Sequence, residues 1–304
     1  TYEQAFSVQP FGGENTYVEL KGSDVVQALE EQWRDDPDRP MFPLGISDNV
    51  SYTYDPAAPV GSKITSVTVD GAPIDPEKTY VVAGSTFLLG GGDNFKAFTK
   101  GTAPANLGYV DLNALVEALS GGQQQRTSQS NVGVHLPAPL TAGKEATIEL
   151  SSLLFDQGET ATTATASLGD ASGSATISPN NGDMTANEYG TATVKLTVPA
   201  GMSGTQELRI TTDAGTEVTV PVEVAAAAGQ AEPNEPEPNK PEQPAEPNKP
   251  NTGGSSTGDL GWIIPVAIAG AFGLANLVAL LFPFAVDRVL AVSYTHLRAH
   301  ETKA

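Results

Sequence analysis

A glycine-rich loop in the first third of the chain combines residue types that could bind a planar, hydroxylated ligand. Three consecutive glycines at 90–92 leave the backbone free to adopt turns that a side chain would block. They are flanked by Phe87, Asp93 and Phe95, which offer aromatic faces for a planar base and a carboxylate for sugar hydroxyls. An ordinary Gly-Gly-Asp turn is the alternative interpretation.

Strands must position this loop. A β-type run at 79–83 leads directly into it, and further strands are predicted at 15–21, 50–55 and 64–69. The last of these is followed by Asp70-Gly71, a strong signal for a hairpin turn. An antiparallel hairpin within an irregular alternation of strands and helices predicts an α+β domain.

Two amphipathic helices complete this domain. The first is expected to begin at Gly22, with Ser23 as its N-cap, and to bury one face formed by Val26, Leu29 and Trp33. The second is expected to be capped by Asp111, to end at Gly121 and to bury Leu112, Leu115, Val116 and Leu119.

Four stretches carry a family resemblance. They are Ser-Val-Gln-Pro-Phe-Gly at 7–12, Ser-Tyr-Thr-Tyr-Asp-Pro at 51–56, Val-Gly-Ser-Lys-Ile-Thr-Ser-Val at 60–67 and Gly-Gly-Gly-Asp at 90–93. In this order and spacing the stretches resemble the C-terminal domain of bacterial 5'-nucleotidases and UDP-sugar hydrolases, over about residues 1–120. The resemblance implies an α+β domain of that type in which Phe11 and Phe87 sandwich the nucleobase and Asp93 accepts hydrogen bonds from the ribose.

The neighbours of these three residues are predicted to contribute as well: Gly13, Asn15, Gly91, Gly92 and Asn94. Two of them depart from the family pattern. Gly13 holds the position where the family usually has an asparagine that reads the base edge, and the nearest asparagine here is Asn15. Asn94 replaces a glycine, a change that a left-handed backbone tolerates because asparagine is the next most permissive residue.

Composition excludes several classes of protein. The 304 residues carry a formal net charge of −20 with only 16 basic residues, which disfavours binding to nucleic acids or to an anionic membrane surface. No cysteine is present, so disulfides, thiolate metal sites and cysteine nucleophiles are excluded. The expected partner is a single nucleotide or nucleoside, and no nucleic acid.

Catalytic metal ligands are missing from the sequence. In the resembled family a two-metal phosphoesterase domain precedes this point, and its site is built from His and carboxylate side chains. The only histidines here are His135, His296 and His300, too few for such a site. The chain is therefore expected to be the C-terminal fragment of a larger hydrolase: inactive alone, without a bound cofactor, and joined to an upstream catalytic domain that holds two divalent metal ions.

The second half of the chain has a different amino-acid composition and pattern. After a predicted linker at 121–133, short Thr-, Val- and Ala-rich runs alternate with turn formers over 134–225, which predicts an all-β immunoglobulin-like sandwich. Asp170, Asp183 and Asp213 could be imagined as a calcium site, but turn carboxylates are the preferred interpretation because their spacing fits no calcium loop. His135, at the entrance of this domain, is expected to be packed or exposed rather than a ligand.

A tether follows the predicted sandwich. Residues 226–258 are rich in Pro, Glu and Asn, repeat Glu-Pro-Asn-Lys-Pro at Glu237 and Glu246, and are predicted to form a disordered stalk rather than an SH3 ligand. Within a predicted transmembrane helix at 259–288, residues 260–286 carry no charge. This pattern predicts a single-pass C-terminal anchor at the extracellular face of the membrane. Lys249 breaks a sortase-like motif, so covalent attachment to the cell wall is the less favoured alternative.

The remaining residues, 289–304, form a non-native tail. From about residue 293 they resemble a translated sequencing adapter and are left out of the functional interpretation. The leading hypothesis is a fragment of a cell-surface 5'-nucleotidase that binds the nucleoside and tethers the enzyme. Hydrolysis of UDP-sugars or 2',3'-cyclic nucleotides is an alternative within the family, and a non-catalytic stalked adhesion module is an alternative of another class.

Overall fold

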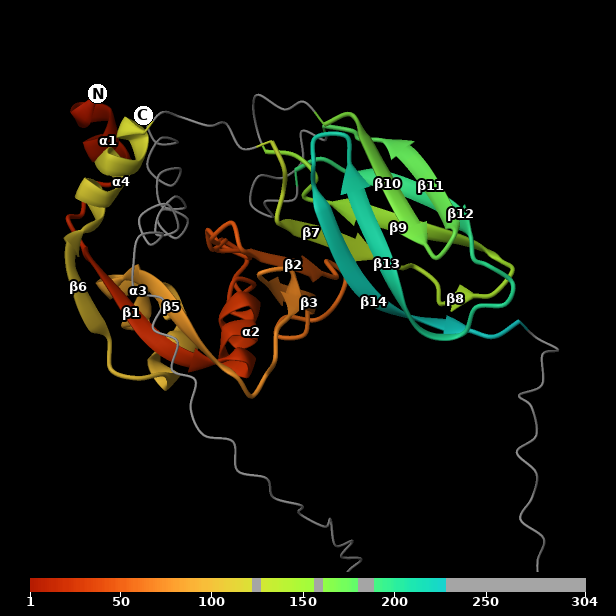
Figure 1. Cartoon of the computed structure of the whole chain (residues 1–304), viewed down its shortest axis with the longest axis horizontal. Coiled ribbons are helices and arrows are strands. Elements are labelled where there is room, and N and C mark those ends of the chain that lie inside the picture. The colour runs from red at the N-terminus through yellow and green to blue at the C-terminus, as the bar shows by residue number, and fades with distance from the viewer. Residues whose placement is uncertain (122–126, 156–160, 180–188, 228–304) are drawn as a thin grey trace, which may run out of the picture. The chain divides into compact units, whose positions relative to one another are not determined.

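The computed structural model describes residues 1–121, 127–155, 161–179 and 189–227 (Figure 1). Residues 228–258 of the predicted stalk, the predicted membrane span and the adapter-like tail lie outside these residues. Across the described ranges, no helix has the length and apolar character needed to cross a membrane.

The first 121 residues contain both strands and helices. The strands are β1 (Glu14–Lys21), β2 (Val50–Tyr54), β3 (Ile64–Val69), β4 (Ala72–Pro73), β5 (Thr79–Ser85) and β6 (Ala105–Val110). The helices are α1 (Tyr2–Val8), α2 (Gly22–Glu30), α3 (Thr86–Leu89) and α4 (Asp111–Ser120), with 3-10 turns η1 (Gly92–Asn94) and η2 (Lys96–Lys100). This is the α+β arrangement that the sequence predicts.

Helix α2 separates two sheets (Figure 1). On one side Ala28 packs with Val18 and Leu20 of β1, in the core beneath the antiparallel sheet β5-β1-β6. On the other side Leu29 packs in a second core with Tyr52 and Tyr54 of β2. Trp33, predicted as a core residue, is 7% exposed and lies 4.9 Å from the Tyr54 ring, measured between centroids.

Three predicted details of the helices are wrong. Helix α2 begins after Lys21 and has no side-chain cap, because a turn at 75–78 supplies acceptors: Gly22 N donates to the Lys78 carbonyl and Ser23 N to that of Pro76. Asp111 is the first residue of α4 rather than its N-cap, which is Val110. Leu119 is 41% exposed, because α4 buries only its first turns.

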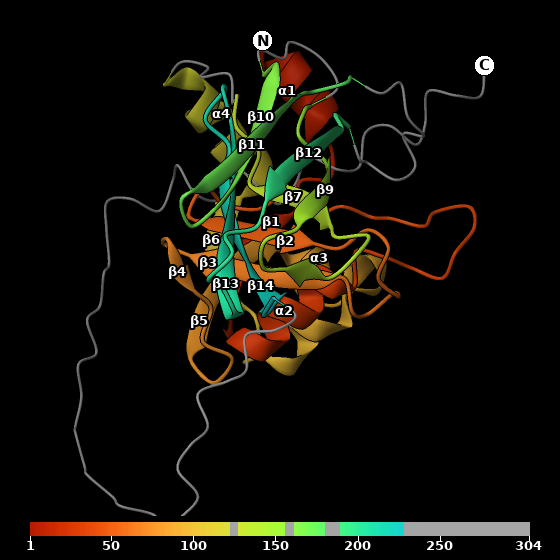
Figure 2. The same ribbon diagram turned by 90° about the vertical axis from the view of Figure 1, so that its right-hand side faces the viewer.

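The described strands of 131–225 fall into two sheets that share one apolar core (Figure 2). The strands are β7 (Asn131–His135), β8 (Leu140–Thr141), β9 (Glu145–Ser151), β10 (Thr163–Leu168), β11 (Ala171–Thr176), β12 (Ala192–Thr197), β13 (Gly204–Thr212) and β14 (Glu217–Ala225). At β11 and β12 the sheets approach so closely that a Cβ on Gly173 would lie 2.0 Å from the Lys195 carbonyl oxygen. The immunoglobulin-like type of this arrangement stays a prediction.

One of these sheets includes strands from the first part of the chain. Its order is β12-β9-β7-β2-β3-β4, and β2 pairs with β7 in parallel. Side chains reinforce the pairing, since the Tyr54 hydroxyl lies 2.7 Å from Ser152 Oγ and His135 Nδ1 lies 2.9 Å from Asp55 Oδ1. β7 begins at Asn131, within the segment 121–133 that is predicted to be linker.

Candidate functional site

Two segments of the predicted site start from the same end of the β1–β5 ladder. Asn15 pairs with Ser85 at this end. The Ser85 hydroxyl accepts a hydrogen bond from Leu88 N and so caps α3, while Thr86 Oγ1 donates to the Glu14 carbonyl at 2.9 Å. The loop before Glu14 carries Phe11. The ladder therefore holds the bases of both phenylalanine-bearing segments.

The two phenylalanines of the predicted clamp are exposed to solvent. Phe11 is 75% exposed and Phe87 is 60% exposed, whereas a phenylalanine of the core is normally covered. Phe95, which the residue pattern offered as a further aromatic face, is 0% exposed and packs in the core with Phe98 and Leu89. The expectation that Phe95 presents its ring to a ligand is wrong, because the turn at Asp93 and Asn94 directs it inward.

The glycine-rich loop follows an unusual backbone path. Gly91, Asp93 and Asn94 have φ angles of +88°, +50° and +64°. Non-glycine residues rarely adopt such angles, and the surrounding contacts must offset a cost of about 1–2 kcal/mol for each. The predicted tolerance of Asn94 for a left-handed conformation is confirmed. The loop leaves the Asp93 side chain half-buried and Asn94 exposed.

Gly92 is required by the Phe87 ring. A Cβ on Gly92 would lie 2.5 Å from Cε1 and 2.6 Å from Cδ1 of Phe87. Such distances are too short for any side chain, so an alanine at Gly92 would displace the ring or the loop. The third glycine therefore leaves room for the aromatic side chain that is predicted to stack on a base.

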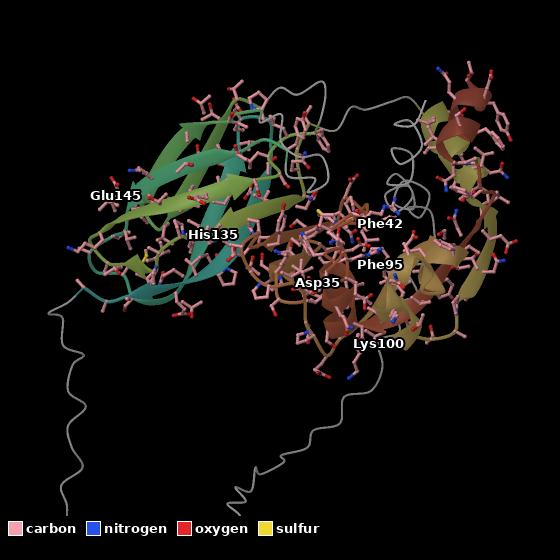
Figure 3. All side chains as sticks on the ribbon, turned by 180° about the vertical axis from the view of Figure 1, so that it is seen from behind. Asp35, Phe42, Phe95, Lys100, His135 and Glu145 are labelled. Carbon is pink, nitrogen blue, oxygen red and sulfur yellow. The ribbon has the colours of Figure 1, made fainter. Side chains whose placement is uncertain are left out.

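Arg34 stabilises the turn at Asp93 through a hydrogen bond to its backbone. Its guanidinium donates a hydrogen bond to the Asp93 carbonyl and lies over the rings of Phe42 and Phe95, at 4.7 Å and 5.4 Å from their centroids. Figure 3 shows Phe42 and Phe95 as neighbours, and their centroids are 6.3 Å apart. Sequence reasoning missed Arg34, because it lies in the loop after α2 and no local pattern connects it to residue 93.

The Phe11 loop is held by α4. Gln9 Nε2 donates to Asp111 Oδ2 at 2.7 Å, and Asp111 N donates to the Gly13 carbonyl at 2.8 Å. Gly13 packs tightly there, since a Cβ would lie 3.1 Å from Asp111 Oδ2. Asn15, which pairs with Ser85 at the end of the β1–β5 ladder, is only 5% exposed. Of the predicted ligand-binding neighbours, Gly13 thus packs against Asp111 and Asn15 is buried. The sequence spacing predicted neither environment.

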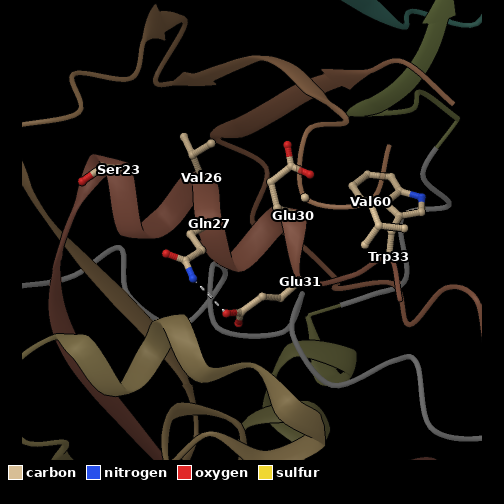
Figure 4. A pocket seen from close by; sticks show the side chains of 8 residues that line it. Ser23, Val26, Gln27, Glu30, Glu31, Trp33 and Val60 are labelled. Atoms are coloured by element: carbon tan, nitrogen blue, oxygen red, sulfur yellow. Dashed lines mark hydrogen bonds between the residues drawn. The ribbon is translucent and has the colours of Figure 1, made fainter. Parts of the chain in front are cut away.

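A separate hollow of about 500 Å³ lies beside α2, lined by residues that include Val26, Trp33 and Val60 (Figure 4). None of Phe11, Phe87 and Asp93 lines it. Its carboxylates are already used: Glu30 accepts from the backbone N–H groups of Lys63 and Ile64, and Glu31 from that of Ala97. Both carboxylates of the hollow therefore accept hydrogen bonds from the backbone.

The carboxylates weighed as a calcium site have turn roles where the structure describes them. Asp213 accepts hydrogen bonds from the Thr162 hydroxyl at 2.6 Å and from the backbone N–H groups of Thr162 and Thr163, and these bonds lower the pKa of Asp213. Asp183 lies outside the described residues. Within the described ranges, no group of three or more His, Asp and Glu side chains could hold a metal ion.

The sequence of the first part of the chain matches a known family. The profile of the 5'-nucleotidase, C-terminal domain matches residues 1–100. Protein UshA of Salmonella pullorum is 33% identical over 117 residues, which cover 38% of this chain and 20% of that protein. The cell wall protein Lmo0130 of Listeria monocytogenes is 37% identical over 103 residues, which cover 33% of this chain and 13% of that protein.

A solved structure gives a weaker likeness. The 5'-nucleotidase precursor from Thermus thermophilus is 25% identical with a TM-score of 0.32, over 38% of this chain and 24% of that one. A TM-score this low leaves the assignment to the sequence matches. The chain spans about a fifth of the length of UshA. Residues 1–100 belong to the family of 5'-nucleotidase C-terminal domains.

Proposed function

We propose that the first part of the chain binds the nucleoside moiety of a nucleotide, with the base between Phe11 and Phe87 and the ribose on Asp93. The observation that carries the proposal is the exposure of the two rings, 75% and 60%, on segments that start from one end of the β1–β5 ladder. An exposed aromatic ring leaves apolar surface in water, and a base that covers it contributes about 1–3 kcal/mol for each stacking contact.

The parent protein is proposed to be a phosphohydrolase of the 5'-nucleotidase type. The family of residues 1–100 and the similarity to UshA support this class. Two divalent metal ions are expected in an upstream domain. The described residues do not fit such ions, so no chemical step is assigned to this chain. Its role is to position the nucleotide, which can account for a large share of a rate enhancement when the reacting groups are held elsewhere.

A surface location is proposed for the intact protein. The uncharged run at 260–286 and the Pro-rich run before it are typical of a stalk and an anchor. Similarity to a Listeria cell wall protein agrees with exposure on a cell surface.

The nucleoside proposal is tested by titration calorimetry of the 304-residue chain with adenosine and with 2',3'-dideoxyadenosine. If Asp93 accepts from the ribose hydroxyls, Asp93→Asn weakens adenosine binding about fivefold or more and changes dideoxyadenosine binding little, because charge-assisted hydrogen bonds contribute about 1.5–3 kcal/mol.

Asp70→Asn is the matched control, since Asp70 also has a left-handed backbone, with φ +54°, but lies in the β3–β4 turn. Equal losses for both ligands with Asp93→Asn, or no binding of either ligand to the wild-type chain, would refute the proposal.

A further inference from the structure

The loop that carries Phe11 is attached at both of its ends to one buried carboxylate residue. Gln9, two residues before Phe11, donates a hydrogen bond from its side-chain Nε2 to Asp111 Oδ2 at 2.7 Å. Gly13, two residues after Phe11, accepts a hydrogen bond from Asp111 N at 2.8 Å. Residues 9 and 111 are distant in sequence, so this attachment joins the N-terminal loop to the start of α4.

The attachment is shielded from water. Gln9 is 7% exposed and Asp111 is 6% exposed, although both residue types normally lie at the surface. Asp111 is further fixed by its other carboxylate oxygen, Oδ1, which accepts from Leu112 N at 2.6 Å. A buried carboxylate at the first residue of a helix is stabilised by the helix dipole and by such N–H groups.

Between these fixed ends the loop places one large side chain in solvent. Phe11 is 75% exposed, and Gly12 beside it has a φ of +60°, which turns the chain sharply. Buried polar contacts that surround an exposed aromatic ring stabilise the loop without covering the ring. The contacts at Asp111 therefore fix the loop on both sides of Phe11.

We propose that Asp111 is a positioning residue for nucleoside binding, which acts through Gln9 and Gly13 to hold the Phe11 ring where a base can stack on it. The inference rests on the proposed function and extends it to a residue that touches no ligand. If the released loop places the ring correctly for about a fifth to a tenth of the time, the apparent Kd rises about five- to tenfold, because it equals the intrinsic Kd divided by the competent fraction.

The test compares Gln9→Ala, Asp111→Ala and Asp111→Asn in the 304-residue chain, with adenosine as the probe in calorimetry. Gln9→Ala and Asp111→Ala are each expected to raise the Kd about five- to tenfold, and together to raise it no further, because both break the hydrogen bond between Gln9 and Asp111. Asp111→Asn is expected to bind adenosine like the wild type, since the Gln9 amide can turn its oxygen toward the new NH₂ group.

One background variant and one control variant separate positioning from a general loss of stability. In a Phe11→Ala background, neither Gln9→Ala nor Asp111→Ala should change the Kd further, because the ring on which they act is absent. Thr216→Val removes the acceptor of a buried hydrogen bond from Gln129 N, far along the chain in the β-rich part, and should lower the melting temperature without changing the Kd. Unchanged Kd values for Gln9→Ala and Asp111→Ala, or losses that persist in the Phe11→Ala background, overturn the inference.

Amide hydrogen exchange gives a readout that needs no ligand. The amide of Asp111, which donates to the Gly13 carbonyl, should exchange faster in Gln9→Ala than in the wild type, while the amides of the β1–β5 ladder should not change. If the wild-type chain binds no adenosine, the nucleoside proposal fails, and exchange alone then judges the positioning inference. Faster exchange supports the attachment, and unchanged exchange overturns it.

Discussion

Phe87→Ala and Phe95→Ala form a matched pair, because the same substitution is made on either side of the glycine loop in opposite surroundings. Phe87 is 60% exposed and Phe95 is 0% exposed. A phenylalanine covers about 150–250 Å² when fully buried, so Phe87 removes about 60–100 Å² from water. At about 25 cal/mol per Å², its loss costs at most about 1.5–2.5 kcal/mol of the free energy of unfolding.

Phe95→Ala is expected to cost more, about 3–5 kcal/mol, because it leaves a cavity between Phe42, Phe98 and Leu89. The order reverses for binding. Phe87→Ala removes one stacking contact, worth about 1–3 kcal/mol, and should weaken adenosine binding about fivefold to more than a hundredfold.

Urea unfolding measures the first quantity and titration calorimetry of the folded variant measures the second. The contrast between the two assays identifies the role of Phe87. If Phe87→Ala destabilises the chain as much as Phe95→Ala and leaves adenosine affinity unchanged, Phe87 is a packing residue and the reasoning is refuted.

Three further predictions follow from the same contacts. Gly92→Ala should weaken adenosine binding about as much as Phe87→Ala, since its Cβ would lie 2.5 Å from the Phe87 ring, while Gly201→Ala, where nothing lies within 4 Å, should have no effect; calorimetry of both variants checks this. Burial raises the pKa of Tyr52 from 10 to about 12. The stability that the neutral Tyr52 side chain contributes is therefore complete below pH 10, and on the order of 2–3 kcal/mol of it is lost as the pH rises toward 12. Denaturant unfolding at these pH values should show the loss in the wild type and not in Tyr52→Phe. Residues 1–225 should release no phosphate from AMP with divalent metals, because the described residues include no metal-binding group, and a phosphate assay above a mock preparation would show otherwise.

The sequence predicted those strands whose β-type residue runs include buried or half-buried side chains. β1, β2, β3 and β5 form where the sequence predicts strands, and Asp70-Gly71 forms the expected turn, with φ angles of +54° and +76°. β6 was missed because it has exposed residues on both faces and a left-handed Gly108, so no alternation marks it. α1 was missed although Thr1 and Gln4 form a capping box, a signal that the sequence does contain.

The site was predictable only in part, because its parts depend on contacts between distant residues. Sequence spacing alone did not distinguish Phe87 from Phe95 as a ligand-binding residue. The fold around Asp93 leaves the Phe87 ring exposed and buries the Phe95 ring in the core. Arg34 and Asp111 organise the two loops through hydrogen bonds to residues far along the chain. No local pattern encodes such pairs.

The central claim is that a nucleobase lies between Phe11 and Phe87. Nuclear Overhauser effects between the base protons of bound adenosine and selectively labelled phenylalanine rings of the 304-residue chain test it most directly. The account predicts effects from these base protons to both rings, and upfield shifts of the base protons that are lost in Phe11→Ala and in Phe87→Ala. Bound adenosine without an effect to either ring, or with unchanged shifts in both variants, would contradict it.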